Sequence, residues 1–301
     1  VVRDHSQLDK FQAYGHHPKH ILSNALTLAD VVVDCTPAGN ENKTKFYEPW
    51  RNSDKIFIAQ GSEKGFGTPY AYGINDEALV DSESNFIQVV SCNTHNIACL
   101  LKTFDSFRGE KDVVLGGDFV CIRRANDISQ DAGYIASPEV SRHTKSPHGT
   151  HHARDVVDLY KTIGRTFEND LFSSAMKINS QYMHVIRFNI TLNGSYSYFH
   201  ISEKIRKNKF IATTYRKTVN RVFSFGREHG FYGRIYNQTV IPMSSLNIHP
   251  KRDKTTVTGF CFTPQDGNSI LSSVAAALYG LHGSQYLTYM KTLDNMLFEE
   301  V

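Results

Sequence analysis

Residues 87–104 read IQVVSCNTHNIACLLKTF, a short apolar run that is followed by Ser91-Cys92-Asn93-Thr94 and then by apolar residues at helical spacing. The pattern predicts a buried β-strand that runs directly into an α-helix. A cysteine in the first turn of such a helix lies among unpaired backbone N–H groups at the positive end of the helix dipole, where a thiolate is favoured. Cys92 is therefore predicted to be a nucleophile.

The helix alone cannot activate Cys92. A shift of the thiol pKa from about 8.5 to about 6 corresponds to roughly 3.4 kcal/mol, whereas a helix terminus supplies at most about 2 kcal/mol. A histidine base is therefore required. His184 is the main candidate, because alternation along residues 183–190 places it opposite its apolar neighbours. His95, one helical turn from Cys92, is the alternative base.

Two further apolar runs, residues 29–34 and 55–60, precede this stretch and are separated by a polar segment of helical length. Such runs indicate buried parallel strands of an α/β sheet. We predict that residues 1–91 form the later part of a Rossmann nucleotide-binding sheet whose first β-α unit is missing. Because the chain opens on Val1 without a glycine-rich turn near its start, we expect a fragment that lacks N-terminal residues.

After the Cys92 helix the pattern changes to long strand candidates. These candidates are residues 113–124, 178–193, 210–225 and 257–263. Of the four, the segment 210–225 mixes strand and turn signals. Long strands with intervening helices predict an α+β domain with a mostly antiparallel sheet, over residues 92–267. Amphipathic helices expected at 269–279 and 284–299 could return to cover the first domain. That domain would then comprise residues 1–91 with 268–301.

The composition is that of a globular protein, with 301 residues, 40% hydrophobic and 21% charged. A net charge of +3 is too weak to indicate a nucleic-acid partner, although it suits an anionic small substrate. The sequence shows neither a signal peptide nor an apolar run near the roughly 18 residues of a membrane span. The odd number of scattered cysteines is typical of reduced thiols, so we expect a cytoplasmic protein. Those expected to be inert and buried are Cys35, Cys99, Cys121 and Cys261.

Residues 126–154 are the longest irregular stretch and carry four histidines. A metal site is one interpretation, but cysteine or carboxylate partners at a familiar ligand spacing are missing, so we predict none. Phosphate or substrate contact is favoured for His151 and His152, and His143 and His148 are expected to be solvated. One guanidinium of the pair Arg123-Arg124 is expected in the active site, because its planar fork suits phosphate or carboxylate.

Several short motifs occur in a specific order. They are Asp34-Cys35-Thr36-Pro37, Gln60-Gly61-Ser62-Glu63-Lys64, Val89-Val90-Ser91-Cys92-Asn93-Thr94, Arg123-Arg124-Ala125-Asn126-Asp127, His151-His152-Ala153-Arg154-Asp155-Val156, Met183-His184, Gly226-Arg227 and Gln265-Asp266. In this order and spacing, the chain resembles the archaeal-type phosphorylating glyceraldehyde-3-phosphate dehydrogenases over nearly its whole length. It departs from the family pattern at His95 and Asn96, where the family usually has threonine and glycine.

The resemblance implies a homotetrameric two-domain oxidoreductase of glycolysis or gluconeogenesis. It would oxidise D-glyceraldehyde 3-phosphate to 1,3-bisphosphoglycerate with NAD or NADP, using inorganic phosphate. A thiohemiacetal and then a thioester would form on the nucleophile. In the family's pattern, Cys92 is the nucleophile and His184 the acid/base. Substrate and phosphate would be bound by Ser91, Asn93, His151 and His152, and the cofactor by Gly61, Arg124 and Gln265.

Two alternatives remain open at this point. One is a related thiol-dependent aldehyde dehydrogenase, acting on aspartate semialdehyde or erythrose 4-phosphate. The other is a catalytically weakened relative that binds nucleotide or RNA through the cofactor cleft. This alternative stays open because His95 and Asn96, beside the nucleophile, depart from the family pattern.

Overall fold

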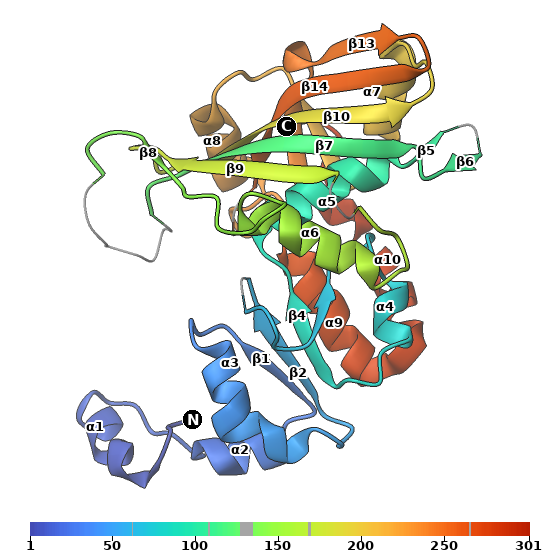
Figure 1. Ribbon diagram of the computed structural model, residues 1–301. Coiled ribbons are helices and arrows are strands. Elements are labelled where there is room, and N and C mark those ends of the chain that lie inside the picture. The colour runs from blue at the N-terminus through green and yellow to red at the C-terminus, as the bar shows by residue number, and fades with distance from the viewer. Residues whose placement is uncertain (62, 108, 127–134, 168–169, 265) are drawn as a thin grey trace.

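The computed structural model describes residues 1–61, 63–107, 109–126, 135–167, 170–264 and 266–301. Two main sheets lie at opposite ends of the molecule, and helices α5 (Cys92–Phe104) and α6 (His151–Lys161) lie between them (Figure 1). The stretch from residue 87 to 104 therefore connects the two halves of the structure.

The first sheet is entirely parallel, in the order β1-β2-β4-β3. Its strands are β1 (Val31–Asp34), β2 (Ile56–Gln60), β4 (Phe86–Val89) and β3 (Thr68–Tyr70). Nearly every residue of β2 and β4 is buried, which is why these strands are continuously apolar in sequence. The predicted parallel α/β sheet is confirmed. The edge strand β3 was not predicted, because its central residue is Pro69, which only an edge position tolerates.

Short helices surround this sheet. Those early in the chain are η1 (His5–Gln7), α1 (Leu8–Ala13), α2 (Leu22–Leu28), α3 (Gly39–Asn42), η2 (Lys43–Tyr47), η3 (Glu48–Trp50) and α4 (Glu77–Val80). From the C-terminal part of the chain, α9 (Ile270–His282) packs against β1, β2 and β4. It is followed by η5 (Gly283–Gln285), α10 (Tyr286–Lys291) and η6 (Asp294–Met296). The second C-terminal helix predicted from the sequence is thus broken into shorter pieces.

The second sheet has eight strands, in the order β11-β12-β14-β10-β7-β9-β8 with β13 paired to β14. The strands are β7 (Val114–Arg123), β8 (Glu139–Val140), β9 (Leu171–Lys177), β10 (His184–Asn193), β11 (Ile211–Thr214), β12 (Thr239–Pro242), β13 (Asn247–Lys251) and β14 (Lys254–Thr263). Among the described strands of this second sheet, only the pairs β7/β9 and β11/β12 are parallel, so the prediction of a mostly antiparallel sheet is confirmed.

Helix α5 packs against β7, β10, β12 and β14 on one side and against α6 on another. It is buried all round, with eleven buried residues among its thirteen, as expected of a helix enclosed by protein. The remaining elements lie around the second sheet: the hairpin β5 (Ser106–Phe107) and β6 (Glu110–Lys111), the helices α7 (Tyr198–Lys207) and α8 (Val219–His229), and η4 (Met243–Ser245). One apolar core cluster runs through both halves of the chain.

Two of the predicted strands are wrong in part. The strand expected over 178–193 begins only at His184, after a loop. Residues 210–225 contain the four-residue strand β11 and then the first part of helix α8, whose buried Val222 and Gly226 are four residues apart. Short apolar runs fit strand and helix periods equally well, and packing decides between them. The domain boundaries stay a prediction.

In the described part of the chain, no helix has the length and apolar character needed to cross a membrane.

Candidate active site

Cys92 is the first residue of α5, and the prediction that it starts a helix directly after a buried strand is confirmed. Ser91 is the N-cap residue, with extended backbone angles of φ −66° and ψ 161°. Its hydroxyl bonds to the Thr94 hydroxyl at 2.8 Å and not to a backbone N–H of the first turn. The Cys92 carbonyl accepts a hydrogen bond of 2.8 Å from Asn268 Nδ2, which fixes the start of the helix.

His184, the first residue of β10, lies beside this thiol. Its Nδ1 is 3.9 Å from Cys92 Sγ, although the residues are far apart in sequence. The imidazole is only 4% exposed, whereas Cys92 is half-buried. Nδ1 also lies 3.0 Å from Asn93 Oδ1. Asn93, predicted to contact substrate, is itself buried and faces His184. A thiol, an imidazole and an amide therefore meet at the start of α5.

His95 occupies a different environment from His184. It is fully buried in α5, and burial lowers the pKa of its imidazole from 6.5 to about 4. Nδ1 donates to the Ser91 carbonyl at 3.1 Å, and Nε2 lies 2.8 Å from the Ser272 hydroxyl. Ser272 also accepts a hydrogen bond from the backbone N–H of Tyr72. His95 therefore links α5 to α9, and this geometry favours His184 as the base.

We expect His95 to make the protein acid-labile. Because its folded pKa is below its unfolded value, the unfolded state binds the proton first, and stability is lost as pH falls from about 6.5 toward 4. The pKa shift of His95 corresponds to a loss of about 3 kcal/mol in the free energy of unfolding by pH 4. The measurement is denaturant unfolding of the parent and His95→Asn at pH 7 and pH 4.5. The stability advantage of the parent should shrink on acidification, and an advantage that is constant with pH contradicts a neutral buried His95.

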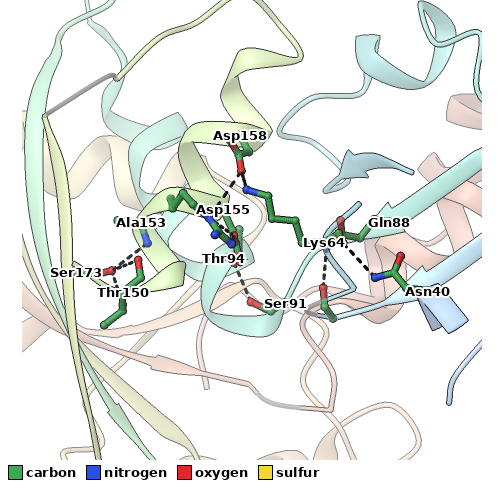
Figure 2. Close-up of polar contacts among 12 residues, drawn as sticks. Asn40, Lys64, Gln88, Ser91, Thr94, Thr150, Ala153, Asp155, Asp158 and Ser173 are labelled. Carbon is green, nitrogen blue, oxygen red and sulfur yellow. Dashed lines mark hydrogen bonds and ion pairs between the residues drawn. The ribbon is translucent and has the colours of Figure 1, made fainter. Parts of the chain in front are cut away.

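The N-terminus of α6 is fixed by a small set of polar contacts (Figure 2). The Thr150 hydroxyl lies 2.7 Å from the Ser173 hydroxyl, and the backbone N–H of Ala153 donates to Ser173 Oγ at 3.0 Å. Further along α6, the Tyr160 hydroxyl donates to the Ala98 carbonyl of α5 at 2.9 Å. These buried bonds set the position of His151 and His152, which begin the helix.

An ion pair also joins α6 to the segment after β2. In Figure 2, Lys64 extends to Asp158 of α6. Both side chains are substantially exposed, so the pair contributes at most about 1 kcal/mol, and the buried contacts position α6. A cleft of about 460 Å³ lies here, lined by Lys64, Gly65, Gly67, Pro69, Gln88, Val90, Asp155, Asp158, Lys161 and Thr162.

The rings of His151 and His152 lie against each other, with centroids 3.9 Å apart and planes tilted by 55°. His152 is 3% exposed, and neither of its ring nitrogens has a hydrogen-bond partner among the described residues. Burial holds the pKa of His152 well below its usual range, and repulsion from His151, Arg123 and His184 adds to this. Burial also lowers the pKa of His151, which the nearby Asp155 carboxylate partly offsets. His152 therefore presents a neutral imidazole whose hydrogen-bonding capacity is unused.

The two arginines at the end of β7 have different surroundings. Arg123 acts electrostatically on both histidines of α6. Arg124 is 2% exposed and pairs with Asp266, with Nη2 and Oδ1 3.5 Å apart. Asp266 follows Gln265, a predicted cofactor contact that lies outside the described residues. The charge of Arg123 thus contributes to lowering the pKa of both histidines, and the sequence did not single out this arginine from its neighbour.

The predicted cofactor side is formed by the end of β2. Gly61 has a φ of +76°, and apart from its chain neighbours no described residue has an atom within 4 Å of where a Cβ would be. Its N–H donates to the Val89 carbonyl, which ties β2 to β4 just before Cys92. Gln60 is a residue that the sequence did not single out. Its Oε1 accepts from Ser273, while its buried Nε2 has no partner in the described part of the chain.

Two expectations on cysteines and histidines need correction. Cys35, which directly follows β1, is exposed and not buried. The other three are buried as expected, and burial raises the pKa of each thiol: Cys99, Cys121 and Cys261. His148 is buried, not solvated, and its Nδ1 bonds to the Leu171 carbonyl at 3.0 Å. His143 is exposed as predicted. Within the described ranges, no group of three or more His, Cys, Asp or Glu side chains is placed to hold a metal ion.

Curated relatives of the chain are archaeal. It is 24% identical to glyceraldehyde-3-phosphate dehydrogenase from Methanocaldococcus jannaschii over 254 residues, which is 82% of this chain and 70% of that enzyme. It is 28% identical to the enzyme of the same name from Sulfolobus acidocaldarius, over 63% of this chain and 51% of that enzyme. For the Thermoplasma volcanium enzyme the identity is 31%, over 61% of this chain and 50% of the relative. The chain thus spans about half the length of the latter two relatives. No family model matches the chain.

Proposed function

We propose that this chain, a homologue of archaeal glyceraldehyde-3-phosphate dehydrogenases, oxidises D-glyceraldehyde 3-phosphate to 1,3-bisphosphoglycerate with NAD or NADP and inorganic phosphate. The observation that carries the proposal is the distance of 3.9 Å between Cys92 Sγ, at the start of a buried helix, and His184 Nδ1. This geometry supplies a nucleophile together with a partner that stabilises its thiolate.

The chemistry of the chain's own residues follows from this pair. The Cys92 thiolate attacks the aldehyde carbon and forms a thiohemiacetal. His184 donates the proton of the thiohemiacetal hydroxyl and takes it back when hydride leaves. A bound nicotinamide supplies the acceptor for hydride. The thioester left on Cys92 is then attacked by inorganic phosphate, which releases the acyl phosphate and restores the thiolate.

The residues at the end of β2 fit a nicotinamide cofactor. Ligands of open parallel sheets bind at the carboxyl ends of the strands. Gly61 leaves room there for close approach, and the unpartnered Nε2 of Gln60 is a buried donor beside it. We propose that Gly61 and Gln60 line the cofactor site, with Arg124 and Gln265 as further contacts.

His151, His152 and Arg123 support binding of an anionic group. A buried imidazole without a partner costs about 1–3 kcal/mol, and a phosphate oxygen that accepts a hydrogen bond from it would remove that cost. Arg123 contributes the positive charge next to this pair. We propose that these residues, together with Ser91, hold the phosphate group of the substrate or inorganic phosphate.

Steady-state kinetics tests the function, using protein expressed from the full coding sequence. We expect nicotinamide reduction with glyceraldehyde 3-phosphate to depend on inorganic phosphate. His152→Ala should raise KM for the aldehyde or phosphate more than it lowers kcat, since an anchoring contact acts in both the ground and transition states. The penalty should shrink with unphosphorylated glyceraldehyde.

An equal penalty with both aldehydes would show that His152 does not anchor phosphate. Preference for aspartate semialdehyde or erythrose 4-phosphate would assign a different substrate, and nucleotide or RNA binding without turnover would overturn the enzyme proposal. Activity lost to a chelator and restored by zinc would favour a metal site at the histidines. A cytoplasmic homotetramer acting in glycolysis or gluconeogenesis completes the proposal.

A further inference from the structure

A chain of buried polar groups leads from the second sheet to the imidazole of His184. Cys261 Sγ donates to Asn96 Oδ1 at 3.1 Å, and Asn96 Nδ2 donates to Thr263 Oγ1 at 2.8 Å. Thr263 Oγ1 donates to Asn93 Oδ1 at 3.3 Å, and that same oxygen lies 3.0 Å from His184 Nδ1. Cys261 is fully buried, and both asparagines and Thr263 are at most 2% exposed.

Every bond in this chain has the same direction. Burial raises the pKa of Cys261 to about 12, so its thiol keeps its proton at neutral pH and acts as the first donor. Asn96 accepts on its oxygen and donates from its nitrogen, and Thr263 then donates its only proton to Asn93. The amide oxygen of Asn93 can only accept, so the contact with His184 requires a proton on Nδ1.

We propose that Asn96 and Thr263 are positioning residues that hold the proton of neutral His184 on Nδ1, the ring nitrogen that faces Cys92. They act through Asn93, which presents its oxygen to the imidazole because Thr263 supplies the opposing hydrogen.

The tautomer decides what His184 does for the thiol. With the proton on Nδ1, that nitrogen shares its N–H between Asn93 Oδ1 at 3.0 Å and, more weakly, Cys92 Sγ at 3.9 Å, which favours the thiolate over the thiol. Nε2 then carries the lone pair and takes up the proton when the imidazolium forms. This consequence rests on the proposed function, whereas the tautomer itself can be measured without any substrate.

The test compares Thr263→Val, which removes the hydroxyl, with Thr263→Ser, which keeps it. Two-bond proton–nitrogen NMR on protein labelled with ¹⁵N-histidine reports the tautomer, and the His184 signals are assigned by their loss in His184→Asn. We expect the Nδ1–H form in the parent and in Thr263→Ser, and a shift toward the Nε2–H form in Thr263→Val. Iodoacetamide alkylation at pH 7, read by mass spectrometry on the Cys92 peptide, should slow by about three- to tenfold in Thr263→Val only.

A second pair of variants tests the series of hydrogen bonds at Cys261, where it begins. This pair decides whether the series sets the His184 tautomer if Thr263→Val does not fold. Cys261→Ala removes the first donor, whereas Cys261→Ser retains one, so only the alanine variant should shift the tautomer. An unchanged tautomer and alkylation rate in both Thr263→Val and Cys261→Ala would overturn the inference, as would equal changes in the matched serine variants. A protein without aldehyde activity whose tautomer still responds to Thr263→Val would disprove the proposed function and leave this inference standing.

Discussion

Cys92→Ser should lower dehydrogenase turnover by more than about 10³-fold, because a serine hydroxyl does not ionise near neutral pH and cannot form the thioester. The fold should be unaffected. The two side chains are similar in size, Cys92 is half-buried, and the contact with Asn268 uses its backbone carbonyl. The measurement is kcat with glyceraldehyde 3-phosphate and phosphate, together with the thermal unfolding temperature.

Cys35→Ser is the matched control, since Cys35 is the exposed thiol after β1. It should retain parental turnover and leave iodoacetamide inactivation unchanged. Turnover of Cys92→Ser within about tenfold of the parent would rule out Cys92 as the nucleophile.

His184→Asn should lower turnover by roughly 10²–10⁴-fold, the usual contribution of a general acid or base. It should also move alkylation of Cys92 by iodoacetamide to higher pH. The Nδ1 atom 3.9 Å from Sγ supplies the thiolate stabilisation that the helix terminus cannot. Both quantities are measured on the protein from the full coding sequence, with alkylation followed on the Cys92 peptide.

His95→Asn separates the two candidate bases. Because its ring nitrogens bond to Ser91 and Ser272, its loss should reduce stability and leave the alkylation profile of Cys92 in place. A shifted profile in His95→Asn with an unchanged one in His184→Asn would transfer the role of base to His95.

Local sequence was sufficient for the features that depend on neighbouring residues. The junction at Cys92 follows from an apolar strand, small polar residues and a helical period within residues 87–104. The parallel strand β2 follows from an apolar run of strand length, because both of its faces are buried. The run that forms β1 is equally apolar, although its Val33 is exposed. Local pattern failed over 210–225, where helix and strand periods both fit and tertiary packing selected α8 after Thr214.

Burial of single polar residues was less predictable. Cys35 follows an apolar strand and His148 lies in an irregular segment, yet the cysteine is exposed and the histidine is buried. Exposure depends on which other elements cover a residue. Short sequence context carries little information about that, particularly in loops.

By itself, the sequence determined the class of the two sheets, the helix that begins at Cys92 and the order of motifs that indicates a thiol-dependent dehydrogenase. Only the tertiary structure decided which histidine meets the thiol, because Cys92 and His184 come together through the packing of α5 on β10. It also decided the direction of the bonds from Cys261 to Asn93, and that the charge of Arg123 acts on the histidine pair. Secondary structure follows from local propensity and burial periods, whereas such contacts depend on the three-dimensional arrangement of elements distant in the chain.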